Sequence, residues 1–335
     1  MTILVTGAAG FIGFSLCRHL LLQGRQIVGI DNLNNYYDVN LKKSRLALLE
    51  RESSFTFLFL DITDRLAIEK LFSDHQVTMV IHLAAQVGVR YSVTNPHQYA
   101  DVNLLGFLNV LEASRQHVIK HFVFASSSSV YGSGAAIPFS EQDKTDGPYS
   151  LYGATKKANE LMAHSYAHLY QLPCTALRFF TVYGPWGRPD MAIFSFTNNI
   201  LSEAPITVYN NGNMLRDFTY VDDVIAGIAA IIDIAPHTHK DVTPYAVYNL
   251  GNSAPVQLKY FIELLEKNLE KKAKIHFQPM HRADVVDTFA NVALLESVIG
   301  KLPHTPIEVG VARFVAWYRQ YCNLQISPAH AKDNV

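Results

Sequence analysis

Short apolar runs alternate with segments of helical spacing in the first half of the chain. Because the runs are apolar on both faces, they are typical of strands in a parallel sheet. They cover Ile3–Val5, Gln26–Ile30, Phe55–Leu60, Met79–Leu83, His121–Ala125 and Cys174–Phe179. Segments starting near Phe11, Leu66 and Val102 space their apolar residues three and four apart. The alternation predicts a Rossmann-type doubly wound α/β sheet with helices on both faces.

The second half is broken by prolines into shorter pieces from about residue 183 onward. Helical spacing returns at Asp222–Asp233, Gln257–Lys271 and Ile307–Cys322. We expect a cofactor-binding domain over residues 1–180 and a smaller mixed α/β substrate lobe over residues 181–330. Segments near residues 215–250 could also return to the first domain, and the sequence leaves this alternative open.

Composition excludes several classes of partner. The chain has 335 residues, with 28 basic against 29 acidic side chains and a formal charge of -1. A nucleic-acid or anionic-membrane binder would carry a basic excess. The three cysteines are far apart and odd in number, which favours thiols in a reducing compartment. With no secretory leader pattern and no apolar run long enough to span a bilayer, a cytoplasmic protein is expected.

A glycine-rich turn links the first predicted strand to the first predicted helix. Gly7, Gly10 and Gly13 follow the spacing GxxGxxG. Such glycines let the backbone turn tightly towards a pyrophosphate, and the helix N-terminus supplies free N–H groups. A purely structural turn is the alternative, but the strand before it and the helix after it favour dinucleotide binding.

Two carboxylates follow at strand ends. Asp31 ends the second strand, where a carboxylate accepts ribose hydroxyls and repels a 2′-phosphate, which selects NAD over NADP. Asp61, with Ile62, ends the third strand near the expected adenine, although capping of the next helix is an equal alternative. Leu83, Ala84 and Ala85 end the fourth strand and would lie beside the pyrophosphate.

Tyr152 and Lys156 stand four residues apart, which places them on one face of a helix. An ammonium near a phenol lowers the phenol's pKa and suits it to acid–base work. A tyrosine and a lysine at this spacing often occur by chance. The serines at 126–129 follow the fifth strand and would emerge at the same carboxyl edge of the sheet.

Taken together, these motifs resemble the extended short-chain dehydrogenases/reductases. The sequences that carry the likeness are TGAAGFIG at 6–13, HLAA at 82–85, SSSSVYG at 126–132 and YGATK at 152–156. A closer likeness is to UDP-glucuronate 4-epimerases, which are NAD-dependent nucleotide-sugar epimerases. It rests on DNLNNYYD at 31–38, AQVGVRYS at 85–92, RFFTVYGPWGRPDMA at 178–192 and RDFTYVDD at 216–223.

The resemblance implies a role for each matching residue. Tyr152 would be the catalytic base, Lys156 its partner and Ser127 the catalytic hydroxyl. The implied NAD site comprises Gly7, Gly10, Phe11, Ile12, Gly13, Asp31, Asn32, Asn35, Asp61, Ile62, Leu83, Ala84, Ala85, Gln86, Asn103, Tyr152, Lys156, Phe180 and Val182. The implied UDP-sugar contacts are Arg90, Ser127, Ser128, Ser129, Tyr152, Thr181, Arg188, Asn199, Val208, Tyr209, Arg216 and Arg282.

One stretch departs from the family pattern. His281-Arg282-Ala283-Asp284-Val285 stands where Gln-Pro-Gly-Asp-Val is usual, which puts the role of Arg282 in doubt. Asn199, Val208 and Tyr209 are candidates for uracil by position only.

Related dehydratases carry Asp-Glu where this chain has Ser128 and Ser129, which lack the acid and base for water elimination. The leading hypothesis is therefore an isomerase, a 4-epimerase of UDP-glucuronate and UDP-galacturonate acting through a 4-keto sugar. Epimerisation of UDP-glucose and a non-catalytic NAD-binding regulator are the alternatives.

Two further expectations concern metals and assembly. His164 and His168 lie four residues apart but lack the flanking glutamate of a zinc motif, so no metal is expected. The predicted long helices at Pro96–His117 and Tyr149–Tyr170 carry more apolar residues than one sheet contact needs. They predict a homodimer formed through a helix bundle, with burial inside one protomer as the alternative.

Overall fold

The computed structural model describes residues 1–132, 136–238, 242–282 and 284–326. The strands are β1 (Thr2–Thr6), β2 (Gln26–Asp31), β3 (Phe55–Phe59), β4 (Val77–His82), β5 (Phe122–Ser127), β6 (Cys174–Phe179), β7 (Thr181–Tyr183), β8 (Pro205–Tyr209), β9 (Leu215–Tyr220), β10 (Tyr245–Leu250), β11 (Pro255–Gln257) and β12 (Lys274–Gln278).

The α-helices are α1 (Phe11–Leu22), α2 (Val39–Leu49), α3 (Arg65–His75), α4 (Tyr91–Thr94), α5 (Pro96–Tyr99), α6 (Phe107–Gln116), α7 (Leu151–Tyr170), α8 (Ala192–Leu201), α9 (Val221–Ile231), α10 (Leu258–Leu269), α11 (Ala293–Ile299) and α12 (Ile307–Ile326). A π-helix η1 (Ala100–Gly106) and the 3-10 turns η2 (Ser128–Val130) and η3 (Asn210–Gly212) complete the elements.

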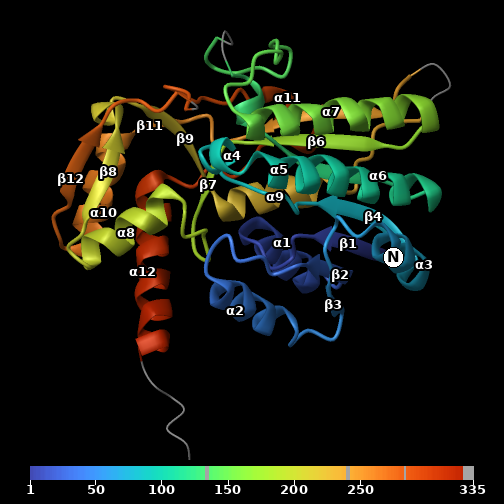
Figure 1. Cartoon of the computed structure of the whole chain (residues 1–335), viewed down its shortest axis with the longest axis horizontal. Coiled ribbons are helices and arrows are strands. Elements are labelled where there is room, and N and C mark those ends of the chain that lie inside the picture. The colour runs from blue at the N-terminus through green and yellow to red at the C-terminus, as the bar shows by residue number, and fades with distance from the viewer. Residues whose placement is uncertain (133–135, 239–241, 283, 327–335) are drawn as a thin grey trace, which may run out of the picture.

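The predicted parallel sheet is confirmed. Seven strands follow the order β10-β6-β5-β4-β1-β2-β3, and every neighbouring pair is parallel (Figure 1). Ligands bind in such sheets outside the carboxyl ends of the strands, where the strand order reverses between β1 and β4. The glycine turn after β1 lies at this point.

The two faces of the sheet bury separate apolar clusters. Ile3 and Val5 of β1 join one cluster with side chains of α1 and α9, while Leu4 joins a second with side chains of α3, α6 and α7. Alternate residues of one strand point to opposite faces, so strands buried on both sides read as continuous apolar runs. This is the physical reason that the strands were visible in the sequence.

Two features differ from the sequence-based expectations, and a third bears on a return that the sequence left open. Helix α2 was not anticipated, because its buried face carries Lys42 and Arg45 among the leucines. The expected helix over 96–117 is interrupted by η1, a π-helix. Such segments are frequent at functional sites. Strand β10 pairs with β6 and so extends the large sheet from the second half of the chain.

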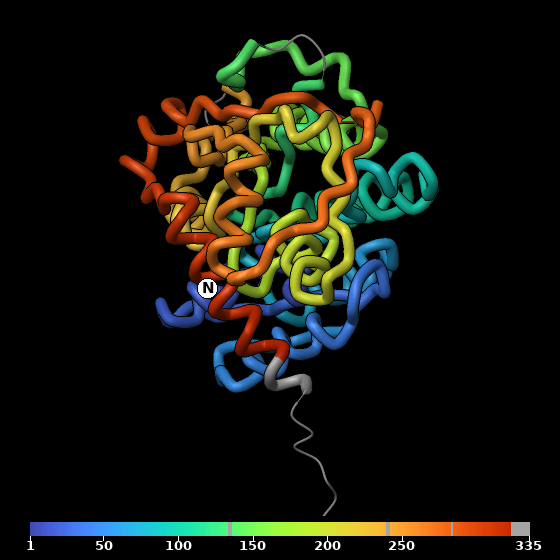
Figure 2. The backbone as a smooth tube through the Cα atoms, turned by 90° about the vertical axis from the view of Figure 1, so that its left-hand side faces the viewer, coloured from blue at the N-terminus to red at the C-terminus, as the bar shows by residue number. Residues whose placement is uncertain are grey.

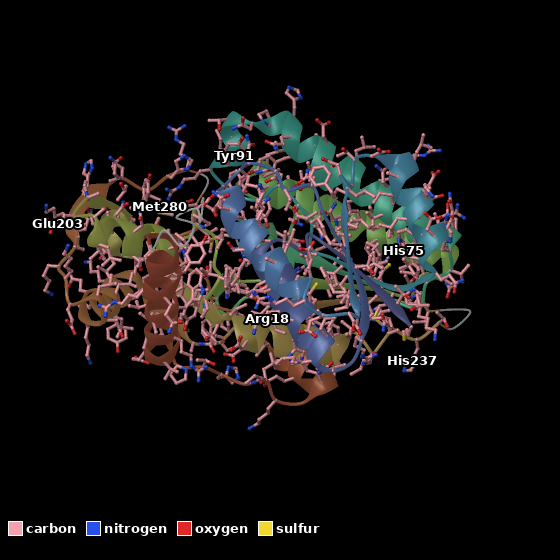
Figure 3. All side chains as sticks on the ribbon, turned by 90° about the horizontal axis from the view of Figure 1, so that it is seen from below. Arg18, His75, Tyr91, Glu203, His237 and Met280 are labelled. Atoms are coloured by element: carbon pink, nitrogen blue, oxygen red, sulfur yellow. The ribbon has the colours of Figure 1, made fainter. Side chains whose placement is uncertain are left out.

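The smaller part contains a three-stranded sheet, β11-β9-β7, and a two-stranded sheet, β12-β8. Helices α8, α10 and α12 pack beside these strands. The view from its side shows α12 running from this part down beside the N-terminal half (Figure 2). In Figure 3, seen from below, Glu203 and Met280 mark the smaller part and His75 and His237 the far end of the molecule. Tyr91 lies between these two ends.

Among the described residues, no helix combines the length and apolar character that crossing a bilayer would require.

Candidate active site

A cavity with about 1300 Å³ of empty space, partly open to solvent, lies at the carboxyl edge of the large sheet. Many residues expected at the cofactor and the reacting sugar line it together. They are Gly7, Gly10, Phe11, Ile12, Gly13, Asp31, Asn32, Asp61, Ile62, Leu83, Ala84, Ala85, Gln86, Ser127, Tyr152, Lys156, Phe180, Val182 and Arg188. Segments from almost the whole first half of the chain therefore converge on one hollow.

The glycine turn has no room for side chains. Gly7 has φ +71°, and a Cβ there would meet the backbone nitrogen of Ala84 at 2.9 Å. A Cβ on Gly10 would meet Gly7 O at the same distance. Gly10 also caps α1 without a side-chain bond, so the N–H groups of the first turn are left to a ligand. This geometry fits a pyrophosphate.

The end of the cavity that is expected to take the adenosine is built around Asp31. Its carboxylate accepts hydrogen bonds from Ala9 N at 3.2 Å and Leu33 N at 2.8 Å. Burial raises the pKa of Asp31, and the ammonium of Lys42, 3.9 Å away, opposes that rise. Lys42 also donates to Asn34 at 2.9 Å, and both residues line the cavity although the sequence did not point to them.

Asp61 is a second, partly buried carboxylate beside the first. Burial would raise its pKa, but hydrogen bonds from Thr63 and Asn32 bring it below the ordinary value. The alternative that Asp61 caps the next helix is wrong, because Asp64 is the N-cap of α3 and accepts from Ala67 N. Asp61 instead holds Asn32 in place at 2.7 Å.

Tyr152 and Lys156 lie in the first turns of α7, where Ser150 caps the helix by accepting from Gly153 N. The Lys156 ammonium donates to Ala125 O at 2.9 Å, and burial lowers the pKa of Lys156 to about 8. Burial raises the pKa of Tyr152, whereas the charge of Arg188 and a hydrogen bond with Ser127 oppose that rise. The phenol, the serine hydroxyl and a guanidinium therefore meet in one place.

A buried ion pair supports this helix from behind. Glu160 of α7 accepts from Arg178 Nε at 2.8 Å and Nη2 at 2.9 Å, and from Ser126 Oγ at 2.6 Å. Arg178 also donates to Tyr131 at 3.1 Å. The network ties α7 to β5 and β6. This network could not be predicted from the sequence, because Glu160 lies outside the Tyr152–Lys156 motif and meets Arg178 only in the folded chain.

Arg188 enters the cavity from the loop after β7. Its guanidinium binds Asp190 through two nitrogens, and Tyr36 donates to the same carboxylate at 3.2 Å. The two bonds fix the orientation of the planar guanidinium. Tyr36 and Asp190 were not among the expected site residues. Both lie in stretches that carry the family likeness, at 31–38 and 178–192, but only the folded chain brings the two stretches together at Arg188.

Asn103 lies in η1 and holds other site residues with its side chain. It accepts from Gln86 N at 2.8 Å, and donates to Gln86 O at 3.0 Å and to Thr155 Oγ1 at 3.1 Å. Gln86 lines the cavity with a buried Oε1 that has no hydrogen-bond partner among the described residues. That oxygen is an acceptor available to a bound ligand.

Other expected residues lie outside the lining of the cavity. They are Asn35, Arg90, Asn103, Ser128, Ser129, Thr181, Asn199, Val208, Tyr209, Arg216 and Arg282. Some of them come together where the segment before α4 meets the smaller part. Arg90 lies 3.6 Å from the ring centre of Tyr209 and pairs with Asp284 at 2.6 Å. Arg216 donates to Val285 O at 2.7 Å and to Val286 O.

The remaining candidates do not come together in this way. Val208 is buried within β8, and Asn199 of α8 donates to Pro205 O at 3.0 Å. Thr181 begins β7. Ser129 donates its backbone N–H to Ser127 Oγ at 3.1 Å, so the serine turn is ordered around the candidate catalytic hydroxyl.

Comparison with known proteins agrees with this geometry. A family model described as the NAD dependent epimerase/dehydratase family matches residues 3–251. An uncharacterized 37.6 kDa protein of Escherichia coli O111:H- is 51% identical, with 96% of this chain and 99% of that protein covered. A probable UDP-glucuronate 4-epimerase of Rhizobium meliloti is 46% identical, with 96% and 97% covered.

Among solved structures, a similar one is a UDP-glucuronic acid 4-epimerase from Bacillus cereus in complex with UDP-glucuronic acid and NAD. It is 34% identical, covers 96% of this chain and 100% of its own, and superposes with a TM-score of 0.87.

Proposed function

Because the chain belongs to the NAD-dependent epimerase/dehydratase family, we propose that it is a 4-epimerase that interconverts UDP-glucuronate and UDP-galacturonate. The observation that carries the proposal is the placement of Arg188 in the same cavity as Tyr152. A guanidinium beside the catalytic phenol suits a sugar that bears a carboxylate. The Rhizobium relative and the Bacillus structure bear names of the same activity.

NAD fits the cavity. The glycine turn and the free N–H groups of α1 would hold the pyrophosphate, and Asp31 the adenosine ribose hydroxyls. Gln86 Oε1, which no described residue binds, gives the cofactor or the sugar a buried acceptor. When bound, NAD supplies reversible hydride acceptance at C4 of the sugar. We assign residues 1–180, with the return near 215–250, to NAD and residues 181–330 to the UDP-sugar.

The chain's own residues carry the proton. Tyr152 takes the proton of the C4 hydroxyl as C4 is oxidised, and gives it back when C4 is reduced from the opposite face. Ser127 orients that hydroxyl through its hydrogen bond with Tyr152. Lys156, which lines the cavity and is buried, would hold the nicotinamide ribose with its ammonium. The reaction leaves the oxidation state of the sugar unchanged overall.

The carboxylate of a uronic acid adds a hazard. Oxidation at C4 makes a β-keto acid, which loses CO₂ when the bond to its carboxylate stands perpendicular to the ketone plane. Arg188, held by Asp190, and hydroxyls of Ser128, Ser129 and Thr181 would keep the carboxylate away from that orientation. Arg90, at the start of α4, and Arg216, in β9, would meet the UDP diphosphate.

The test uses purified protein with UDP-glucuronate and, separately, UDP-glucose. Formation of UDP-galacturonate from the first, with Tyr152→Phe as the inactive control, supports the proposal. Conversion of UDP-glucose alone would indicate a neutral-sugar epimerase, and product from neither sugar would indicate a regulator. Both outcomes would overturn the proposal, since a positioned carboxylate-binding cation has no use for a neutral sugar.

We also propose a homodimer formed by α6 and α7, in a cytoplasmic protein whose three cysteines are free thiols. The two helices pack side by side (Figure 1) and leave Leu161 60% and Leu169 64% exposed. Such a two-helix face can bury itself against its own copy. A monomer mass in light scattering at working concentration would contradict the dimer.

A further inference from the structure

Arg45 of α2 is a fully buried cation without a resident carboxylate in its hydrogen bonds. Its exposed fraction is 0%, and within the described part of the chain its four hydrogen bonds go to neutral oxygens. Its Nε has no partner among the described residues. Burying a guanidinium removes its hydration, and an apolar side chain of similar size would avoid that loss. We therefore ask which structural role the hydrogen bonds of Arg45 have.

The four bonds join two segments that are far apart in the chain. Nη1 donates to Ala9 O and to the Tyr37 hydroxyl, both at 2.8 Å. Nη2 donates to Trp186 O at 2.6 Å and to Gly187 O at 3.2 Å. Ala9 belongs to the glycine turn and gives its own N–H to Asp31. One guanidinium thus links the pyrophosphate turn to the loop after β7.

That loop has a backbone that needs support. Trp186 has φ +62°, a conformation that bulky residues rarely adopt. Its carbonyl is one of the acceptors of Arg45. Two residues further along is Arg188, whose guanidinium reaches the cavity. A shift of the Trp186 peptide would therefore move the start of the segment that carries Arg188.

The other side of the loop packs on α12. The Trp186 ring lies 5.4 Å from that of Trp317 and 5.6 Å from that of Tyr321, and α12 descends beside α2 (Figures 1 and 2). These ring contacts fix where the indole lies. The peptide carbonyls of the loop are fixed by Arg45.

We propose that Arg45 is a positioning residue that sets the place of Arg188 relative to the cofactor turn, and so controls whether the 4-keto uronic acid is re-reduced or loses CO₂. The inference rests on the proposed function. It assigns to Arg45 no contact with the substrate.

The competing reaction gives the readout. If the carboxylate turns perpendicular to the C4 ketone, the C5–C6 bond breaks and CO₂ leaves. The electron pair passes into the enolate of the ketone, which takes a proton at C5. The hydride removed from C4 then stays on the nicotinamide. Each such event releases one CO₂ and leaves one reduced nicotinamide, both of which can be measured.

The experiment compares Arg45→Met, Arg45→Lys and a matched control, Leu46→Ala, with the wild type. Leu46 is the next residue of α2, is buried, and does not bond the loop. CO₂, UDP-galacturonate and reduced nicotinamide are measured after addition of UDP-glucuronate. For Arg45→Met we expect epimerisation to fall about 100-fold, as for a misplaced catalytic group, with about tenfold more CO₂ per epimerised sugar.

Arg45→Lys should lie in between, because one ammonium can hold the turn or the loop but lacks the fork that holds both. Leu46→Ala should melt at a lower temperature and keep the wild-type ratio. A wild-type ratio in both Arg45 variants would overturn the inference. Should Arg45→Met fail to fold, the ratio in Arg45→Lys decides in the same way.

A second measurement does not depend on activity. The chain has two tryptophans, and both lie in this contact. Near-ultraviolet circular dichroism of the Arg45 variants should therefore differ from that of the wild type, whereas Leu46→Ala should match it. If the wild type fails to convert UDP-glucuronate, the proposed function falls, yet an altered tryptophan signal still supports the positioning role. An unchanged signal overturns that role.

Discussion

The buried charge of Lys156 is expected to lower the free energy of unfolding of the cofactor-free protein. Its side chain is 3% exposed, and burial lowers its pKa from the ordinary 10.5 to about 8. Each pKa unit corresponds to about 1.4 kcal/mol, so keeping this ammonium charged in the cofactor-free protein disfavours folding by about 3 kcal/mol at pH 7. Under the proposed function, the charged lysine serves the reaction.

Replacing Lys156 with Met should reverse that cost. Met fills similar volume without a charge, but Ala125 O then loses its donor, which costs about 1–3 kcal/mol. At pH 7 we therefore expect Lys156→Met to be as stable as the wild type or up to about 2 kcal/mol more stable. Its epimerase activity should be lost.

The sign of the change in stability with pH follows from the two pKa values of Lys156. The folded state releases the Lys156 proton near pH 8, whereas the unfolded state keeps it to about pH 10.5. Between these values the unfolded state binds more protons, so wild-type stability contributed by this group rises with pH. By pH 10 most of the penalty is gone, and Lys156→Met should be the less stable protein.

The assay is urea unfolding of cofactor-stripped protein at pH 7 and pH 10, with the exposed Lys120→Met as the control. The stability difference between Lys156→Met and wild type should change by about 2–3 kcal/mol between the two pH values, and that of Lys120→Met should stay constant. A Lys156→Met protein that is several kcal/mol less stable at both pH values would refute the reasoning.

Two further predictions concern other buried charges. Asp31→Asn should raise affinity for NADP about 100-fold in titration calorimetry, because the repelling carboxylate is removed while Lys42 remains beside it; unchanged affinity would count against this role. Glu160→Gln should destabilise the protein by about 3–5 kcal/mol in urea unfolding, since Arg178 stays buried without its anion; a loss below about 1 kcal/mol would contradict the supporting network.

Much of the fold could be predicted because its strands are apolar on both faces. Ile3 and Leu4 point to opposite clusters, so the continuous apolar run indicates a strand that is buried on both faces. The same rule fails for α2. Its inward face presents Lys42 and Arg45, whose partners are a carboxylate, an amide and backbone carbonyls supplied by other segments. No local pattern carries that information.

The candidate site divides along the same line. Gly7, Asp31 and Tyr152 were predictable because each belongs to a short motif beside a strand or helix end. Asp190 and Tyr36 were not, because their relation to Arg188 exists only after two distant loops meet. Contacts between charged groups from distant segments form only in the folded chain and cannot be read from local sequence. Backbone turns and helix faces are set mainly by neighbouring residues, so they can be predicted.

The most direct test of the account is conversion of UDP-glucuronate in ²H₂O, followed by nuclear magnetic resonance of the sugar. Since the hydrogen removed from C4 is the one that returns, we expect UDP-galacturonate with no deuterium at C4, and a wild-type protein that releases almost no CO₂. Deuterium at C4, or no UDP-galacturonate at all, would contradict 4-epimerisation at this site.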